Sequence, residues 1–223
     1  MARTTNPTLT EEEKLWRQGR MLVGVDEAGR GPLAGPVVAA AVAICLSDDA
    51  LVEEFMKLGV RDSKFILPKK REQLYGILTA HTAVSWGVAS VDEKAIDRIN
   101  ILQASLLAMK YAVDAMMKKQ SVPQQPYLYI DGRDIIPDMS VDQKAVIGGD
   151  AIVFSIAAAS IIAKVTRDRM MGVYAKEYPQ YQFEQHKGYG TKLHYAAMRE
   201  HGPCPIHRKS FLKSVIDKGA KGR

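Results

Sequence analysis

The sequence predicts an α/β fold in which helices cover a mixed sheet. The first observation is the order of the segments: three apolar, β-branched runs follow one another, and the later runs alternate with long helical segments. The second is the apolar spacing, which takes a helical period between Asp92 and Lys119. Short connections favour antiparallel strands and helical crossovers favour parallel ones, so both are expected in one sheet.

The first part of the chain is expected to hold short helices and three strands. A helix covers residues 9–20, with Thr10 as its cap and three glutamates in its first turn. Between the second and third strands, the sequence predicts a short helix, a loop and a helix that opens at Pro68. A glycine-rich loop joins the first two strands, and the three strands cover residues 20–26, 36–45 and 83–91.

The second part of the chain alternates helices with strands. Strands are expected at 127–131 and 145–150, and an Ala-rich helix from about Ser155 to Tyr178. A basic region punctuated by Gly and Pro follows, with a further helix or two. The long helix before these strands has apolar residues at steps of four, three, four and three, namely Leu102, Leu106, Met109, Val113 and Met116.

Charge and composition restrict the classes of protein. Residues 181–223 hold nine Lys and Arg against three Asp and Glu, whereas residues 1–180 hold 22 of each, so the C-terminal part carries the net charge of +6. This basic end indicates an anionic partner, nucleic acid above all, although a solvated tail would have the same charge.

The sequence contains no apolar run of about 20 residues and starts with a polar segment, so we expect a soluble protein that is not exported. Cys45 and Cys204 lie far apart, and reduced thiols in the cytoplasm are the default.

Acidic side chains follow three of the predicted strands. Asp26 and Glu27 come after the first strand, Asp131 after the fourth and Asp150 after the fifth. Ligands gather beyond the carboxyl ends of strands in such sheets, so these groups are expected to converge. Carboxylates without matching cations repel one another, and a divalent metal ion resolves that repulsion. Oxygen ligands alone favour Mg²⁺ or Mn²⁺ over Zn²⁺.

Each carboxylate taken alone also has a structural interpretation. A surface position would explain any of them, and Asp150 could cap the helix that follows it. Neighbouring side chains on a regular strand point to opposite faces, so Asp26 and Glu27 meet one metal ion only if the strand is already turning. Gly29 and Gly31 permit such a turn.

The loop AGRGPLAG, residues 28–35, suits a sugar-phosphate chain better than a nucleotide cofactor. Its glycine spacing is GxGxxxG and a strand follows it, so neither a dinucleotide-binding loop nor a P-loop ending in GK[ST] is predicted. Gly29 and Gly31 let the backbone approach a ligand closely, and Arg30 between them supplies a cation.

Four side chains near the C-terminus imitate a zinc site. They are the histidines and the cysteine of HGPCPIHRKS together with one earlier histidine: His194, His201, Cys204 and His207. Their spacing matches no common zinc module, and prolines constrain the loop that carries them. A zinc site is therefore not predicted.

Five separated motifs follow one another over roughly residues 21–212. They are GVDEAGRGPLAGPVV, DSK at 62–64, YIDG at 129–132, GD at 149–150 with SIAAASIIAKVTRD behind it, and HKGYGT at 186–191. These motifs resemble those of bacterial ribonuclease HII, in the same order. The GRG after the Asp-Glu pair is similar to the type HII pattern and unlike that of ribonuclease HIII.

The resemblance implies the ribonuclease H-like fold, a five-stranded mixed sheet flanked by helices, with a C-terminal helical appendage. Residues 21–212 would form a single domain, with an α/β core at 21–178 and a helical region at 179–212 that grips the substrate. Residues 1–20 would be an N-terminal extension with a short helix, and residues 213–223 a basic tail.

The resemblance also implies endonucleolytic hydrolysis of the RNA strand in RNA–DNA hybrids and incision at single ribonucleotides embedded in duplex DNA. Such cleavage leaves 3′-hydroxyl and 5′-phosphate ends and serves ribonucleotide excision repair and primer removal. The enzyme would act as a monomer with two Mn²⁺ or Mg²⁺ ions about 4 Å apart. By family match, the catalytic, metal-binding carboxylates are Asp26, Glu27, Asp131 and Asp150.

The same resemblance implies the substrate contacts. Gly29–Gly31 would meet the 2′-hydroxyl, Tyr189 would stack on the sugar of the next deoxynucleotide, and Lys64 and Lys164 would contact phosphates. A tyrosine held in a glycine turn is the structural alternative for Tyr189. From the residues alone, Lys164 and Arg167 could serve phosphate or merely solvate the outer face of their helix, whose small-residue stripe packs on the sheet, and the resemblance favours phosphate for Lys164.

Two other functions stay open. A non-catalytic module could bind hybrids through the basic C-terminal region and show no turnover with any divalent ion. A related nuclease on the same fold could have a preference like that of ribonuclease HIII.

Overall fold

The computed structural model describes residues 6–45, 48–119 and 125–212. A five-stranded sheet lies at its centre, in the order β3-β2-β1-β4-β5. The first three strands are antiparallel neighbours, whereas β4 runs parallel to β1 and β5 parallel to β4. The predicted mixed sheet is therefore confirmed. The strands are β1 Arg20–Ala28, β2 Val37–Ile44, β3 Val84–Val91, β4 Gln125–Asp131 and β5 Gln143–Val146.

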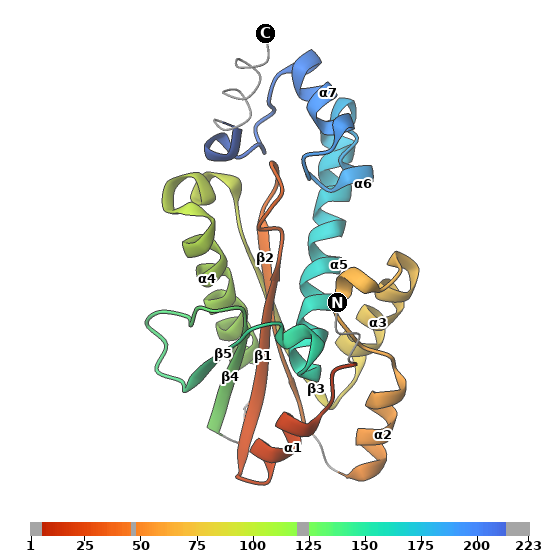
Figure 1. The fold of residues 1–223 in the computed structure, drawn as a ribbon, viewed down its shortest axis with the longest axis vertical. Coiled ribbons are helices and arrows are strands. Elements are labelled where there is room, and N and C mark those ends of the chain that lie inside the picture. The colour runs from red at the N-terminus through yellow and green to blue at the C-terminus, as the bar shows by residue number, and fades with distance from the viewer. Residues whose placement is uncertain (1–5, 46–47, 120–124, 213–223) are drawn as a thin grey trace.

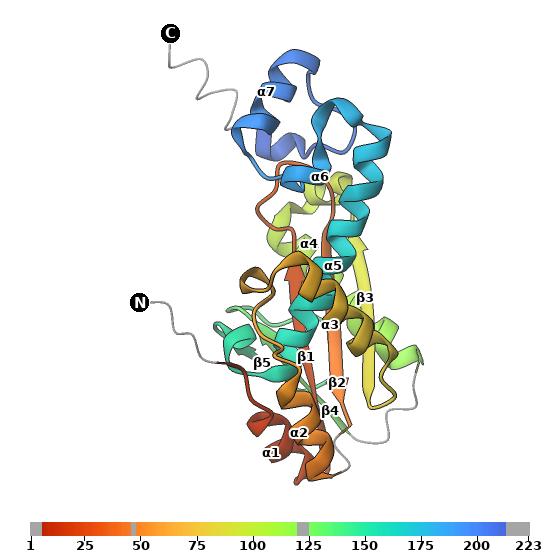
Figure 2. The same ribbon diagram turned by 90° about the vertical axis from the view of Figure 1, so that its right-hand side faces the viewer.

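Helices cover both faces of this sheet. In Figure 1, α4 lies on one face, while α3 and the long α5 lie on the other. The C-terminal helices lie at one end of the molecule, and α1 lies at the opposite end (Figure 2). No helix in the described ranges is long and apolar enough to cross a membrane. The helices are α1 Thr10–Trp16, α2 Asp49–Lys57, α3 Pro68–Ala80, α4 Glu93–Lys119, α5 Phe154–Glu177, α6 Phe183–His186 and α7 Lys192–His201, with short 3₁₀ turns η1 Ser63–Phe65, η2 Gly149–Ala151 and η3 Pro179–Tyr181.

The central strands are buried on both faces. Every residue of β2 is buried, and alternate residues contribute to two separate apolar clusters, one under α5 and one under α4. Close contact between β1 and α5 depends on Gly24, because a Cβ at this position would collide with the backbone of Ser155 and Ile156. The Ala-rich stripe of α5 is thus a packing surface, as its sequence predicts.

The long helix after Asp92 is less regular than its apolar spacing predicts. Asn100 lies within α4 with a φ of 66° and a ψ of 167°, which interrupts the helix. Its side-chain oxygen accepts a hydrogen bond from the backbone N–H of Gln103 at 3.1 Å, as the cap of a new helical start does. An uninterrupted helix was therefore the wrong expectation at this position.

The N-terminal segment packs against the sheet and α5. Leu9 and Leu15 are buried, and Thr8 forms a parallel bridge with Val153 just before α5. The prediction that Thr10 caps α1 is wrong, because the cap position is Leu9 and no side chain there accepts a hydrogen bond. The predicted basic tail at 213–223 lies outside the described residues.

Glu12 connects the N-terminal segment to the start of α5. Its side chain is 3% exposed, and its carboxylate accepts a hydrogen bond from the backbone N–H of Ser155 at 2.7 Å. Burial raises the pKa of Glu12 from 4.5 to about 7. The folded protein therefore holds this proton more tightly than the unfolded chain. The contribution of Glu12 to the free energy of unfolding falls as pH rises from about 4.5 to 7.

Replacing Glu12 by glutamine should remove this pH dependence. Gln keeps an oxygen that can accept from Ser155 and carries no charge. We expect Glu12→Gln to match the wild type near pH 4.5 and to be about 1–3 kcal/mol more stable at pH 8.5. Urea unfolding at both pH values measures the difference, with Glu13→Gln, a neighbouring and partly exposed position, as control. The same difference at both pH values would contradict the assignment.

Candidate active site

Three of the predicted carboxylates meet at one end of the sheet. Asp26 lies on β1, Asp131 ends β4, and Asp150 lies in η2, just before α5. Each offers an oxygen, and these three oxygens all lie within 4.8 Å of one another. In the described part of the chain, this acidic triad is the one group of three or more His, Cys, Asp or Glu that could hold a metal ion.

Asp150 reaches the triad from a position that differs from the predicted one. The fifth strand ends at Val146, and the chain then turns through Gly148, with a φ of 66°, into η2. Asp150 therefore does not follow directly on a strand end. It does not cap α5 either, since the cap position is Val153 and no side-chain hydrogen bond is made there.

Glu27 stands apart from the acidic triad. Both Asp26 and Glu27 belong to β1, in regular pairing with β2, so the strand does not yet turn at this point. The carboxylate of Glu27 lies 3.4 Å from the guanidinium of Arg30, and its backbone N–H donates to Asp26 at 2.7 Å. The structure thus brings three of the four predicted ligands together and leaves Glu27 beside them, facing the glycine loop.

The electrostatics of the triad fit a divalent cation. Burial raises the pKa of Asp26 well above its ordinary value, and the charges of Glu27 and Asp131 raise it further. Burial, with repulsion from Asp131, raises the pKa of Asp150 to about 6. Lys64 is the nearby cation, with its Nζ 3.9 Å from Asp150. Without further positive charge, the negative charges of these carboxylates repel one another. Their all-oxygen donor set fits Mg²⁺ or Mn²⁺.

All the residues predicted to contact substrate line one pocket. Its volume is about 270 Å³, and Glu27, Ser63 and Ser160 also line it. Tyr189 is 44% exposed there, and its ring lies over Gly31. The predicted residues in this pocket are Gly29, Arg30, Gly31, Lys64, Lys164 and Tyr189.

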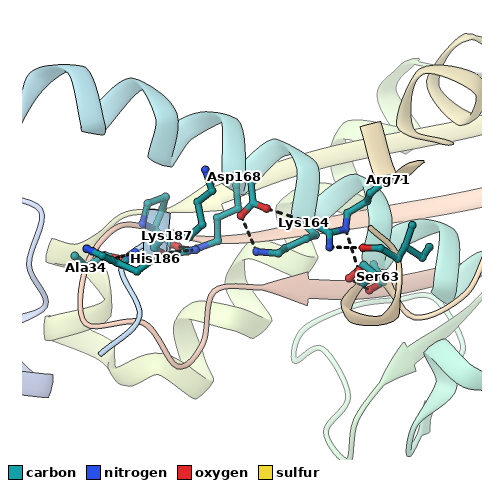
Figure 3. A network of polar contacts seen from close by, with 12 residues as sticks. Ala34, Ser63, Arg71, Lys164, Asp168, His186 and Lys187 are labelled. Atoms are coloured by element: carbon teal, nitrogen blue, oxygen red, sulfur yellow. Dashed lines mark hydrogen bonds and ion pairs between the residues drawn. The ribbon is translucent and has the colours of Figure 1, made fainter. Parts of the chain in front are cut away.

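A polar network behind the pocket holds its two lysine-bearing segments (Figure 3). The buried Arg71 donates to the carbonyl oxygen of Ser63 at 2.9 Å and lies 3.4 Å from Asp168. Asp168 in turn accepts from Lys164 at 2.6 Å. The hydroxyl of Ser160 donates to that of Ser63 at 2.8 Å. The Lys164–Asp168 pair, four residues apart on one helix, was visible in the sequence, but the role of Arg71 was not.

Two fully buried arginines hold the glycine loop through hydrogen bonds to carbonyl oxygens. Arg167 donates to the carbonyl oxygens of Pro36, Ala34 and Lys187 at 3.0, 3.1 and 2.9 Å. Arg208 donates to the carbonyl oxygens of other loop residues. Both expectations for Arg167 are therefore wrong: its side chain has no exposed surface, so it neither solvates the outer face of α5 nor lies open to a phosphate.

The residues that imitate a zinc site do not form one. His194 and His207 are buried, and their Nε2 atoms lie 3.0 Å apart in a hydrogen bond with each other. His201 is directed elsewhere, with its ring edge-on to Tyr181 at 6.2 Å.

Solved structures define the class of protein to which this arrangement belongs. Ribonuclease H2 from Pyrococcus horikoshii OT3 matches with a TM-score of 0.64 and 30% identity, over 85% of this chain and 93% of that one. The PCNA:RNase HII complex from Archaeoglobus fulgidus contains a match with a TM-score of 0.66 and 25% identity, over 85% and 94%. Bst-RNase HIII, solved with Mn²⁺, has a TM-score of 0.57 and 17% identity, which supports the fold alone. The class is thus the ribonucleases H of the HII type.

Sequence comparisons give the family within that class. A family model described as Ribonuclease HII matches residues 23–214. Ribonuclease HII of Caldicellulosiruptor saccharolyticus is 50% identical over 206 residues, covering 92% of this chain and 94% of its own length. Ribonuclease HII of Chlorobium luteolum is 47% identical over 204 residues, covering 90% and 92%. The chain belongs to the ribonuclease HII family and is a ribonuclease H, a hydrolase.

Proposed function

We propose that this ribonuclease H cleaves the RNA strand of RNA–DNA hybrids and incises duplex DNA at single embedded ribonucleotides. The observation that carries the proposal is the acidic triad next to a pocket that gathers every predicted substrate contact. Glu27 and Lys64 link the two, because both line the pocket and Lys64 also approaches Asp150. The placement supports phosphodiester hydrolysis beside a site suited to reading a sugar.

The proposed metal ligands are Asp26, Glu27, Asp131 and Asp150, and the proposed cofactor is a pair of Mg²⁺ or Mn²⁺ ions. Divalent ions in such a site activate water and stabilise charge on the phosphate and the leaving oxygen. Backbone hydrogen bonds hold two of the carboxylates in place: Asp131 accepts from Gly149, and Asp26 accepts from its own neighbour, both at 2.7 Å. Water is the proposed nucleophile and the 3′-oxygen the proposed leaving group: the new bond joins the water oxygen to phosphorus and the P–O3′ bond breaks, so the ends would be a 3′-hydroxyl and a 5′-phosphate.

The pocket residues supply substrate selection. Backbone groups of Gly29–Gly31 are proposed to hydrogen-bond the 2′-hydroxyl, which both donates and accepts and so distinguishes RNA from DNA. Lys64 and Lys164 are proposed to neutralise phosphates, and Asp168 holds the ammonium of Lys164 toward the pocket wall.

Two free cysteines, Cys45 and Cys204, agree with a reducing cytoplasm, where we expect the enzyme to act as a monomer.

Three duplexes of one sequence test the proposal. They carry a single ribonucleotide, a complete RNA strand or DNA alone, and each is incubated with Mg²⁺ or Mn²⁺. We expect incision of the first two and none of the third. Binding without turnover would overturn the proposal in favour of a binding module. Cleavage of the complete RNA strand alone would indicate a preference like that of ribonuclease HIII.

Tyr189 is expected to act at the junction between a ribonucleotide and the following deoxynucleotide. Its exposed ring can pack flat against a sugar that lacks the 2′-hydroxyl. For comparison, stacking of a base on an aromatic ring is worth about 1–3 kcal/mol, and we take the lower end for a sugar. Tyr189→Ala should therefore lower kcat/KM about tenfold on a single-ribonucleotide duplex and much less on a long hybrid. Tyr111→Ala, another half-exposed tyrosine, is the control. Equal losses on both substrates would argue against the stacking role.

A further inference from the structure

We propose that the dipeptide His207–Arg208 is a positioning element that holds both substrate-reading parts of the pocket, the Gly29–Gly31 loop and Tyr189. The inference rests on the proposed function, which assigns substrate contacts to those two parts. Neither residue lines the pocket, so both would act through other groups.

Arg208 holds the glycine loop by its main-chain carbonyl oxygens. Its guanidinium donates to Gly29 at 2.6 Å, to Arg30 at 2.9 Å and to Gly35 at 2.9 Å. Its side chain has no exposed surface, and burial together with the charge of Arg167 lowers its pKa to about 9. Within the described ranges no carboxylate forms an ion pair with it.

A buried guanidinium without a carboxylate partner is costly, and here three carbonyl oxygens from one loop compensate for it. Those carbonyls point inward to Arg208. Fixing the carbonyls of Gly29 and Arg30 also fixes the planes of the peptide groups that follow them, and so the directions of the N–H groups of Arg30 and Gly31. Arg208 therefore determines which loop groups remain available to a ligand.

His207 reaches Tyr189 through a relay of imidazoles whose tautomers follow from the hydrogen bonds. Nδ1 of His207 lies 2.9 Å from the backbone N–H of Cys204, which can only donate, and 3.2 Å from the carbonyl oxygen of Cys204, which can only accept. The shorter contact, together with the carbonyl oxygen of Tyr189, which requires a hydrogen on Nδ1 of His194, assigns the hydrogen of His207 to Nε2. Nε2 of His207 then donates to Nε2 of His194 at 3.0 Å. The hydrogen of His194 is left on Nδ1, which donates to the carbonyl oxygen of Tyr189 at 3.0 Å.

The surroundings keep the relay neutral. Burial lowers the pKa of His194 to about 4 and also lowers the pKa of His207. His186 stacks on His194 with ring centroids 4.4 Å apart, and its Nδ1 accepts from the N–H of Gly188 in the turn before Tyr189. Two stacked, uncharged imidazoles thus hold the turn, one at Gly188 and one at Tyr189.

Backbone contacts also join three segments: the one that carries His207 and Arg208, the glycine loop, and the turn before Tyr189. His207 bridges Ala34 of the glycine loop, and the N–H of Arg208 donates to the carbonyl oxygen of Leu33 at 2.9 Å. The N–H of Leu33 in turn donates to Gly188 at 2.8 Å. The side chain of Arg208 therefore contacts the glycine loop itself, and the side chain of His207 reaches the carbonyl oxygen of Tyr189 through His194.

Nitrogen-15 NMR of the full chain without substrate tests the relay. We expect His207 to carry its hydrogen on Nε2 and His194 on Nδ1. The opposite tautomer at His194 would overturn the relay. The tautomers are measured without catalysis, so this result does not depend on the proposed function. The proposed function fails separately, if the wild-type enzyme does not incise at a ribonucleotide.

Kinetics test the positioning role. His194→Leu breaks the relay, and we expect it to lower the ratio of junction cleavage to long-hybrid cleavage at least about fivefold, as the loss of one hydrogen bond allows. His194→Asn can keep a donor near the position of Nδ1 and should recover most of that ratio.

Arg208→Lys cannot span three carbonyls and should raise KM about tenfold on both substrates. Gln180→Ala, exposed in η3, is the control. An unchanged ratio in His194→Leu would overturn the role of His207, which reaches Tyr189 only through His194, and an unchanged KM in Arg208→Lys would overturn the role of Arg208.

Discussion

Asp26→Asn should lower kcat on a single-ribonucleotide duplex at least about 1,000-fold while leaving a folded protein. Charge stabilisation by bound divalent ions is worth several kcal/mol, and each 1.36 kcal/mol is a factor of ten in rate. An amide at position 26 keeps an oxygen for the N–H of Glu27 but supplies a weaker metal ligand. Initial rates at saturating Mg²⁺ measure the loss, and Asp134→Asn, an exposed position in the loop after β4, is the matched control.

The same variant should be more stable than the wild type in a chelator. The pKa of Asp26 is raised by burial and by Glu27 and Asp131, so its charged form is unfavourable in the folded state. Removing that charge should increase the free energy of unfolding, and about 1 kcal/mol corresponds to a Tm higher by about 2–4 °C. Adding Mg²⁺ should raise the Tm of the wild type more than that of the variant. Wild-type activity, or a variant destabilised in chelator, would contradict the assignment.

The carboxylates of the triad also predict how metal-free stability depends on pH. The pKa of Asp150 is raised from 3.8 to about 6, so the folded protein binds its proton more tightly than the unfolded chain between these values. The free energy of unfolding should consequently fall as the pH rises through about 4 to 6. Urea unfolding in chelator across this range measures the fall, which Asp150→Asn should reduce.

Gly29→Ala should destabilise the protein by about 3 kcal/mol, whereas Gly31→Ala should leave its stability nearly unchanged. Gly29 has a φ of +99°, and a Cβ there would collide with the buried side chain of Arg167, which three hydrogen bonds hold in place. A Cβ on Gly31 would meet nothing closer than the ring of Tyr189 at 3.7 Å. The two glycines of one motif thus differ: the first is needed for packing and the second borders the open pocket.

Thermal unfolding and kinetics of these variants separate the two roles. Gly29→Ala should lower the Tm by about 6–12 °C. Gly31→Ala should keep the Tm and lose activity on ribonucleotide substrates, because its methyl group takes up space where the backbone is proposed to meet the 2′-hydroxyl. Equal stabilities, or a Gly31→Ala enzyme with wild-type kcat/KM, would contradict this division.

Much of the site could be predicted because local patterns carry it. Carboxylates are visible where an apolar run stops, and β4 ends at Asp131 as expected, whereas β1 continues two residues beyond Asp26 and still brings it into the acidic triad. Asp150 was assigned to the right cluster but to the wrong element. The turn through Gly148 and η2 depends on packing against residues distant in sequence, which an apolar run does not reveal.

Buried charges were the main feature that sequence patterns did not reveal. Arg71, Arg167, Arg208 and Glu12 read as surface residues, since charged side chains are rarely buried unless paired. The partners of Arg167, Arg208 and Glu12 are backbone groups far away in the chain, such as Gly29 for Arg208. Arg71 binds the nearby carbonyl oxygens of Ser63 and Ile66 and the distant carboxylate of Asp168. Only the fold brings these groups together, so neither composition nor periodicity could indicate them.

Incision of a duplex with one ribonucleotide, first in chelator and then with Mn²⁺ or Mg²⁺ titrated back, tests the central claim most directly. The wild type should show no incision in chelator and recover it as the ion is restored, with ends that are a 3′-hydroxyl and a 5′-phosphate. Asp131→Asn should recover far less at any ion concentration. Incision at the same rate with and without chelator would contradict the claim that the acidic triad works through bound divalent ions.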